Sequence, residues 1–168
     1  MAKLAELNAR PFDDSVAEFL RCCGASRWAE IMAASRPYPS EDVVYLAAER
    51  AWAQMGKEDY LEAFRAHPMI GGVAELRTKF ASTAQWAKGE QAGVAGAPEE
   101  VLQDLASGNE LYLAKFGYKF IICATGLSAP RMLLSLSERL GHEPEEELSI
   151  SAAEQAKITR LRLEKLLR

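Results

Sequence analysis

The stretch SEDVVYLAAERAWAQM, residues 40–55, has the periodicity of an amphipathic helix. Its apolar residues recur every three or four positions and would share one face of that helix: Val44, Ala48, Ala51 and Met55. Ser40 is a favourable N-cap residue, and the acidic pair after it complements the positive end of the helix dipole. We therefore predict a helix that begins just after Ser40 and buries one apolar face.

Helical periodicity continues on both sides of this stretch. Before it, a helix is expected to end at Gly24, with these residues on its inner face: Phe12, Val16, Phe19, Leu20 and Cys23. A short helix around Trp28 is expected to follow. After it, we expect helices at residues 57–66, 75–91, 98–117, 128–141 and 144–168, the last with Leu148, Ile158, Leu161 and Leu166 inward.

The run FIICATG, residues 120–126, departs from this periodicity. Its β-branched residues are typical of a strand, but a sheet needs partner strands and no second convincing strand occurs. We expect buried, extended chain here. The sequence predicts an all-α protein in which residues 1–168 form a single compact domain of seven to nine helices.

Composition restricts the classes of partner. The 168 residues are 49% hydrophobic with a net charge of −4, and no basic stripe favours nucleic acid. No apolar run approaches the roughly 20 residues that cross a membrane, and no secretory signal is evident, so we expect a cytoplasmic protein. The cysteines, Cys22, Cys23 and Cys123, are expected to be free thiols.

His67 is the stronger candidate for chemistry among the two histidines. Pro68 disfavours helical backbone at His67, so the preceding helix should end near Ala66, and a helix C-terminus favours an imidazolium. A histidine can exchange protons near neutral pH. His142 lies in a Gly-His-Glu-Pro turn and is given no functional role. No metal-ligand spacing, nucleotide-binding loop or nucleophile elbow is found, so no metal site is expected.

Four blocks of sequence together are similar to one known family. They are FRAHPMIGG (64–72), GEQAG (89–93), KFGYKFIICATG (115–126) and ITRLRL (158–163). In this order they resemble the OHCU decarboxylase family, where OHCU is 2-oxo-4-hydroxy-4-carboxy-5-ureidoimidazoline. The resemblance implies an all-helical carboxy-lyase that needs no cofactor. It would convert a small-molecule substrate, OHCU, into (S)-allantoin during urate degradation.

The resemblance also implies site residues. The family's catalytic histidine and glutamate fall on His67 and Glu90. Residues implied to bind substrate are Pro68, Ala87, Gln91, Ile121, Ile122, Cys123, Ala124, Thr125 and Arg162. The family has serine where this chain has Ala87, and many members have arginine where it has Thr125. Both departures bear on substrate affinity and leave the two catalytic positions unchanged.

The family suggests a homodimer, for which Met32, Tyr38 and Tyr45 are the expected exposed apolar positions. Two other functions stay open from the sequence. One is a non-catalytic helical module that holds a purine-like ligand or a partner helix beside His67. The other is a hydrolase of a different ureide, in which His67 activates water.

Overall fold

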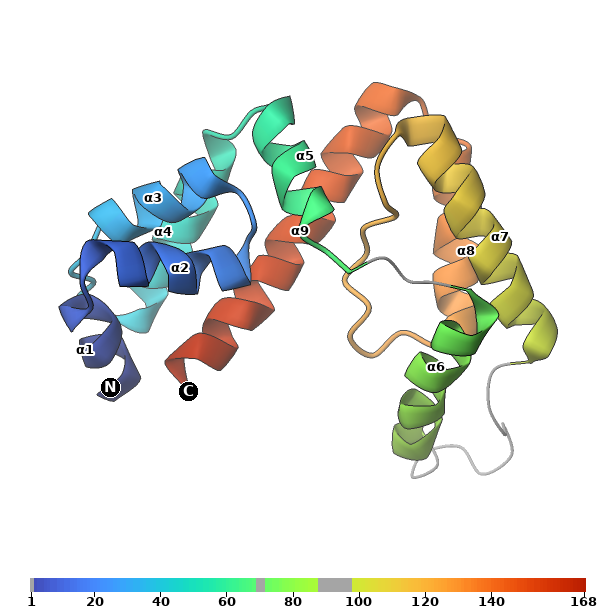
Figure 1. Cartoon of the computed structure of the whole chain (residues 1–168), viewed down its shortest axis with the longest axis horizontal. Helices are drawn as coiled ribbons and strands as arrows, with labels where there is room; N and C mark the ends of the chain where they lie inside the picture. Colours follow the sequence, from blue (N-terminus) through green and yellow to red (C-terminus); the bar gives the residue numbers. More distant parts are fainter. Residues whose placement is uncertain (1, 69–71, 88–97) are drawn as a thin grey trace. The chain divides into compact units, whose positions relative to one another are not determined.

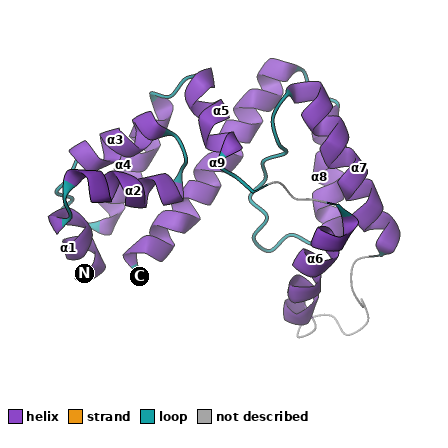
Figure 2. Ribbon diagram, in the orientation of Figure 1, coloured by secondary structure: helices purple, strands orange, loops and turns teal. Residues whose placement is uncertain are grey.

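The computed structural model describes residues 2–68, 72–87 and 98–168, with only the backbone for residues 81–87. These residues form nine helices and no strand (Figure 1, Figure 2): α1 (Ala2–Ala9), α2 (Phe12–Cys22), α3 (Ser26–Ala34), α4 (Glu41–Ala53), α5 (Lys57–Arg65), α6 (Val73–Ala87), α7 (Glu99–Phe116), α8 (Ala129–Leu140) and α9 (Pro144–Leu167). The all-α class expected from the sequence is confirmed. No helix in the described ranges is long and apolar enough to cross a membrane.

The helices belong to two compact units, which are described separately. Unit 1 contains Met1–His67, Ile121–Cys123 and Leu148–Arg168, and unit 2 contains Pro68–Phe120 and Ala124–Glu147. Unit 1 therefore holds α1–α5 and most of α9, whereas unit 2 holds α6–α8 and the first turn of α9. The single-domain organisation expected from the sequence stays a prediction.

Trp28 joins three helices in the core of unit 1. Its ring is fully buried and meets the ring of Phe19 edge-on, with 6.0 Å between the centroids. Its indole N–H donates to the carbonyl oxygen of Ala48 at 3.1 Å. Because this polar atom has a partner, the large ring is buried without leaving a donor unsatisfied. The three residues come from α3, α2 and α4.

The residues expected at an exposed interface are buried instead, so that prediction was wrong. Met32, Tyr38 and Tyr45 are 0%, 3% and 9% exposed. Asn8, in the unpredicted helix α1, makes two hydrogen bonds of 2.8 Å with the backbone of Tyr38. Arg160 of α9 places its guanidinium 3.7 Å from the centroid of the Tyr45 ring. The flanking helices α1 and α9 therefore contact Tyr38 and Tyr45, respectively.

Helix α2 turns a different face inward from the one predicted. Its buried residues are Ser15, Phe19 and Cys22. Phe12, the first residue of the helix, is 49% exposed, and Leu20 is 36% exposed. Leu20 lies about 100° around the helix axis from Phe19, which places it beside the buried face. The predicted inner stripe of five residues was therefore too wide.

Helix α9 also differs from prediction in its buried face. Leu161 is 38% exposed, whereas Leu163 and Leu167 are buried. The same buried face includes two polar residues, Gln155 and Thr159, which are 0% and 6% exposed. Polar groups at such depth require hydrogen-bond partners. The partner of Gln155 is His67, as described below.

The helix boundaries predicted at Ser40, Ser128 and Gly117 are confirmed, whereas α2 ends at Cys22, two residues before Gly24. The hydroxyl oxygen of Ser40 accepts from the backbone N–H of Val43 at 3.4 Å, at the start of α4. Ser128 makes the equivalent bond with Arg131 at 3.3 Å, at the start of α8. Gly117 ends α7 with φ of 81°, a left-handed conformation that glycine adopts without steric cost.

In unit 2, α7 packs against α8 and both helices reach the first turn of α9 through a buried carboxylate. Gly108 allows the first contact, because a Cβ atom there would lie 2.6 Å from Leu136. Glu147 is 0% exposed and accepts hydrogen bonds from the Tyr112 hydroxyl at 2.5 Å and from Arg139 Nε at 2.6 Å. The core of unit 2 therefore contains an ionic cluster.

Candidate functional site

His67 directly follows the end of α5, as its position before Pro68 predicted. Ala66 caps the helix, and the backbone N–H of His67 donates to the carbonyl of Phe64 at 3.2 Å. Gly24, which follows α2, lies against this helix end, since a Cβ atom at position 24 would overlap the Cβ of Ala66. Position 24 therefore needs glycine, because the chain there approaches the end of α5 closely. This contact helps to set the position of His67.

The His67 side chain is half-buried and reaches a buried residue of α9. Its Nε2–H donates to Oε1 of Gln155 at 2.5 Å. The amide nitrogen of Gln155 in turn donates to the hydroxyl of Thr159 at 3.1 Å. All three residues lie in unit 1. The imidazole is thus held by a hydrogen-bonded chain of side chains that carry no formal charge of their own.

Two cysteines of unit 1, Cys22 and Cys23, are buried. Burial raises the pKa of the Cys23 thiol to about 11, although hydrogen bonds from Ala25 and Thr159 oppose that change. Burial likewise raises the pKa of Cys22 to about 11. Both thiols are free and stay protonated at neutral pH, so they are poor nucleophiles.

Residues 121–125 are non-helical, as expected, and only partly buried. Ile121 is buried, Ile122 and Cys123 are half-buried, and Thr125 is exposed. Among the described residues, the backbone groups of Ile122 and Cys123 make no hydrogen bond, whereas the carbonyl of Ala124 accepts from Leu127 at 3.1 Å. Half-buried peptide groups with unused hydrogen-bonding capacity are suited to binding a planar polar ligand.

Arg162 lies on α9 two turns beyond Gln155, about 10 Å along the helix axis. Its guanidinium donates to the carbonyl of Cys22 at 3.3 Å, at the C-terminal end of α2. It also lines a cavity of about 470 Å³ with several other cationic side chains, including Lys165 and Arg168. The structure therefore gives Arg162 a contact with the end of α2 that the sequence did not suggest.

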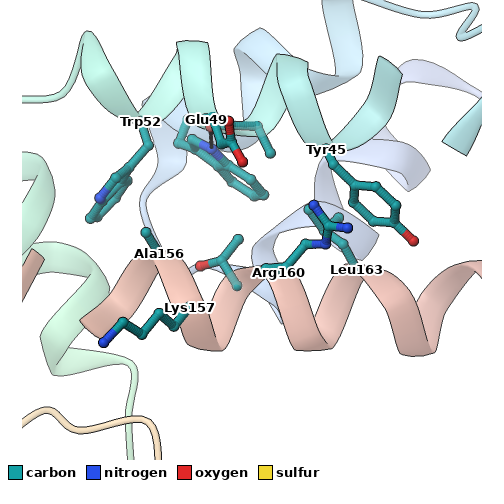
Figure 3. A pocket seen from close by; sticks show the side chains of 10 residues that line it. Tyr45, Glu49, Trp52, Ala156, Lys157, Arg160 and Leu163 are labelled. Carbon is teal, nitrogen blue, oxygen red and sulfur yellow. Dashed lines mark hydrogen bonds between the residues drawn. The ribbon is translucent and has the colours of Figure 1, made fainter. Parts of the chain in front are cut away.

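A second cavity lies between α4 and α9 in unit 1. It measures about 210 Å³, and Figure 3 shows Tyr45 and Trp52 of α4 facing Ala156 and Leu163 of α9 across it. Thr159 also lines this cavity. The walls are mainly apolar and aromatic, so the cavity is poorly suited to a polar ureide.

Comparison of this chain with known proteins identifies its family. The model of the OHCU decarboxylase family matches residues 8–164, nearly the whole chain. The chain belongs to the OHCU decarboxylase family. The resemblance noted in the four sequence blocks is thereby confirmed.

Known relatives of this OHCU decarboxylase family member differ in length. The uric acid degradation bifunctional protein TTL of Arabidopsis thaliana is 40% identical over 149 residues, which are 89% of this chain and 46% of that protein. This chain thus spans less than half of that relative. The 2-oxo-4-hydroxy-4-carboxy-5-ureidoimidazoline decarboxylase of Haloferax volcanii is 29% identical over 95% of this chain and 93% of its own length.

A solved structure of an OHCU decarboxylase in the presence of (S)-allantoin superposes with a TM-score of 0.71. The two sequences are 39% identical, and the match covers 89% of this chain and 96% of the other. This chain therefore shares the all-helical fold of that OHCU decarboxylase.

The site residues implied by the family fall in different parts of the described structure. His67, Arg162 and residues 121–123 belong to unit 1, together with Gln155. The remaining described positions belong to unit 2, namely Pro68, Ala87 (backbone only), Ala124 and Thr125. Glu90 and Gln91 lie outside the described residues, so the pairing of His67 with Glu90 stays a prediction.

Gln155 is the residue that the sequence analysis missed. A usable signal was present, because Ala152, Gln155, Thr159 and Leu163 recur at three- and four-residue intervals along α9. A long amide on an otherwise inward-facing stripe indicates a buried polar group with a specific partner. Among the described residues, no three His, Cys, Asp or Glu side chains gather in a possible metal site.

Proposed function

We propose that this chain decarboxylates OHCU to (S)-allantoin in urate degradation, without a cofactor, and that His67 transfers a proton during the reaction. Membership of the OHCU decarboxylase family over residues 8–164 supports the substrate and the reaction class. The observation that carries the role of His67 is its half-buried imidazole, held by Gln155 immediately after α5. A fixed histidine that can titrate near neutral pH is suited to proton transfer.

The substrate itself can take up the electrons that decarboxylation leaves behind. When the bond between C4 and the carboxylate carbon breaks, its electron pair can move into the neighbouring C=N bond of the ring. The ring nitrogen gains a proton and an enol forms at C4. The 4-hydroxyl then loses its proton while C5 gains one, which restores a carbonyl group. We assign His67 to this proton movement, a contribution of roughly 10²–10⁴ in rate for a positioned acid or base.

The other family positions are proposed to hold the substrate. Glu90 would accept hydrogen bonds from the ureido and ring N–H groups. The backbone of residues 121–125 would bind the planar amide edges, so that C5 is protonated from one face. The unused backbone groups of Ile122 and Cys123 support this role. Arg162 would orient the carboxylate, although too tight an interaction there would stabilise the ground state and slow the reaction.

We also propose a cytoplasmic location and a homodimeric assembly. Membership of the OHCU decarboxylase family supports both proposals. Met32, Tyr38 and Tyr45 are excluded as its interface, because they are buried within unit 1.

The test is circular dichroism of freshly generated OHCU after addition of the protein. Enantioselective acceleration of (S)-allantoin formation supports the proposed reaction. His67→Asn should retain the far-UV spectrum of the wild type and lose about 10²–10⁴ in rate. His142→Asn is the matched control, because His142 belongs to the ionic cluster of unit 2, and it should turn over normally. Ligand binding without turnover would favour a non-catalytic module.

A further inference from the structure

We propose that Gln155 is a positioning residue for His67, which fixes Nε2–H and so makes Nδ1 the nitrogen that exchanges the proton in the reaction. This inference rests on the proposed function and adds a residue that acts through the imidazole. It is drawn from the side chains of unit 1 alone.

The contact between the two residues joins distant parts of the chain at short range. Nε2 of His67 and Oε1 of Gln155 are 2.5 Å apart, although the residues are separated by 88 positions. Gln155 is 0% exposed, so water does not compete for its amide oxygen. A hydrogen bond made in such surroundings orients the imidazole ring firmly.

The direction of this hydrogen bond is fixed by the next residue. The Gln155 amide nitrogen donates to the hydroxyl oxygen of Thr159 at 3.1 Å. The amide oxygen therefore faces His67 and acts only as an acceptor. Hydrogen-bond donation runs one way, from His67 to Gln155 and from Gln155 to Thr159.

One consequence is a defined tautomer of His67. Because Gln155 Oε1 can only accept, Nε2 carries a hydrogen whether the imidazole is neutral or charged. In the neutral form the lone pair is then on Nδ1. Proton exchange at Nδ1 leaves the bond to Gln155 intact, so the ring keeps its orientation throughout the reaction.

A second consequence follows from the charge of the partner. A carboxylate at this distance would stabilise the imidazolium and raise the pKa of a histidine by about 1–3 units. The amide of Gln155 orients the ring and supplies no such charge. Glutamine at position 155 therefore orients the ring without adding a negative charge beside Nε2.

The test is the pH dependence of kcat in variants of Gln155. Gln155→Glu keeps the shape and the acceptor but adds a charge, and we expect its profile to move upward by at least about one pH unit. Gln103→Glu is the matched control, since Gln103 is exposed on α7, and its profile should coincide with the wild type. Gln155→Leu removes the acceptor and should lower kcat about tenfold to a hundredfold, with a smaller change in KM.

Two variants of Thr159 test whether its hydroxyl group orients Gln155 or whether the residue only fills space in the core. Thr159→Ser keeps the hydroxyl that orients Gln155 and should retain the wild-type profile. Thr159→Val removes the hydroxyl at nearly equal volume and should lower kcat. Equal kcat values for Thr159→Val and the wild type would contradict a chain that fixes the amide.

Imidazole nitrogen NMR gives a readout that does not depend on activity. With two histidines in the sequence, His142→Asn assigns the remaining ring signals to His67. Wild-type protein should show hydrogen on Nε2 in the neutral form, and Gln155→Leu should mix the tautomers. Loss of activity in His67→Asn, together with an unchanged pH profile and tautomer in the Gln155 variants, would overturn the role of Gln155 alone. Wild-type activity in His67→Asn would instead overturn the proposed function.

Discussion

His67 and His142 occupy similar places in their units but hydrogen-bond to side chains of different charge. Each follows a helix end, and each backbone N–H donates at 3.2 Å to a carbonyl three residues earlier. The side chain of His67 meets the amide of Gln155, whereas Nδ1 of His142 lies 2.9 Å from a carboxylate oxygen of Glu147. Both partners belong to α9.

The two histidines differ in the charge of the side chain to which each one hydrogen-bonds. Glu147 is fully buried and also accepts from Arg139 and Tyr112, so His142 is one member of an ionic cluster. Changing the charge of His142 alters the balance of that cluster. The Nε2–H of His67 donates instead to a neutral amide oxygen. Proximity to a helix end is common to both, whereas the charge of the partner is not.

The largest expected effect on stability comes from removing the carboxylate of Glu147 from the ionic cluster that includes His142. Glu147→Ala leaves Arg139 buried without its carboxylate, which should lower the free energy of unfolding by about 3–5 kcal/mol. Urea denaturation followed by circular dichroism measures this. Glu146→Ala is the matched control on an exposed neighbour, with an expected change within about 0.5 kcal/mol. Similar values for the two variants would show that the cluster is not a stabilising feature.

A smaller effect is expected where Gly24 supports the helix end before His67. Gly24→Ala places a methyl group on Ala66, so we expect a loss of about 1–3 kcal/mol in stability and a lower kcat, because His67 is displaced. The double variant Gly24→Ala/Ala66→Gly removes the overlap and should recover much of both. Failure of the second substitution to restore activity would argue against this contact as the support of His67.

The smallest expected effect is the pH dependence of stability that arises from the two buried thiols of unit 1, Cys22 and Cys23. The pKa of Cys22 and of Cys23 is about 11 in the folded protein, chiefly because of burial, against an ordinary value of 9.0. Between these values the unfolded chain loses thiol protons that the folded protein keeps, so stability falls as pH rises from 9 to 11.

At pH 10 this loss should be on the order of 1 kcal/mol per thiol. It is measured as the change in unfolding free energy between pH 8 and pH 10. Replacing Cys22 and Cys23 by alanine should remove that part of the decline, whereas replacing the half-buried Cys123 should not. An equal decline in all three proteins would mean that the two thiols ionise alike in both states.

Local sequence signals predicted helix boundaries well and buried faces less well. Ser40, Ser128 and Gly117 act through atoms a few residues away, so their patterns sufficed. The inner faces of α2 and α9 depend on which other helices pack against them. That is why Leu20 and Leu161 were placed inside although the structure exposes them. Helix α1 was missed because its eight residues contain only two buried leucines.

The candidate site was predictable to the extent that it rests on local chemistry. The proline after His67 indicated the helix end, which is observed. The partner of His67 was not predictable in the same way, because Gln155 is 88 residues distant and its pairing depends on how α9 packs. His142 was treated as a simple turn residue for the same reason, since only packing brings Arg139 and Tyr112 to Glu147.

The discontinuity of unit 1 has a consequence for biosynthesis. Met1–His67 is completed by Leu148–Arg168, so the segment that carries His67 leaves the ribosome long before α9 is available. Until α9 is translated, the apolar surface of α2–α4 lacks part of its cover, and such surfaces are prone to aggregation. Ribosome-bound chains truncated before position 148 should therefore depend on chaperones, and the imidazole of His67 should acquire its fixed orientation only in the final stage of folding.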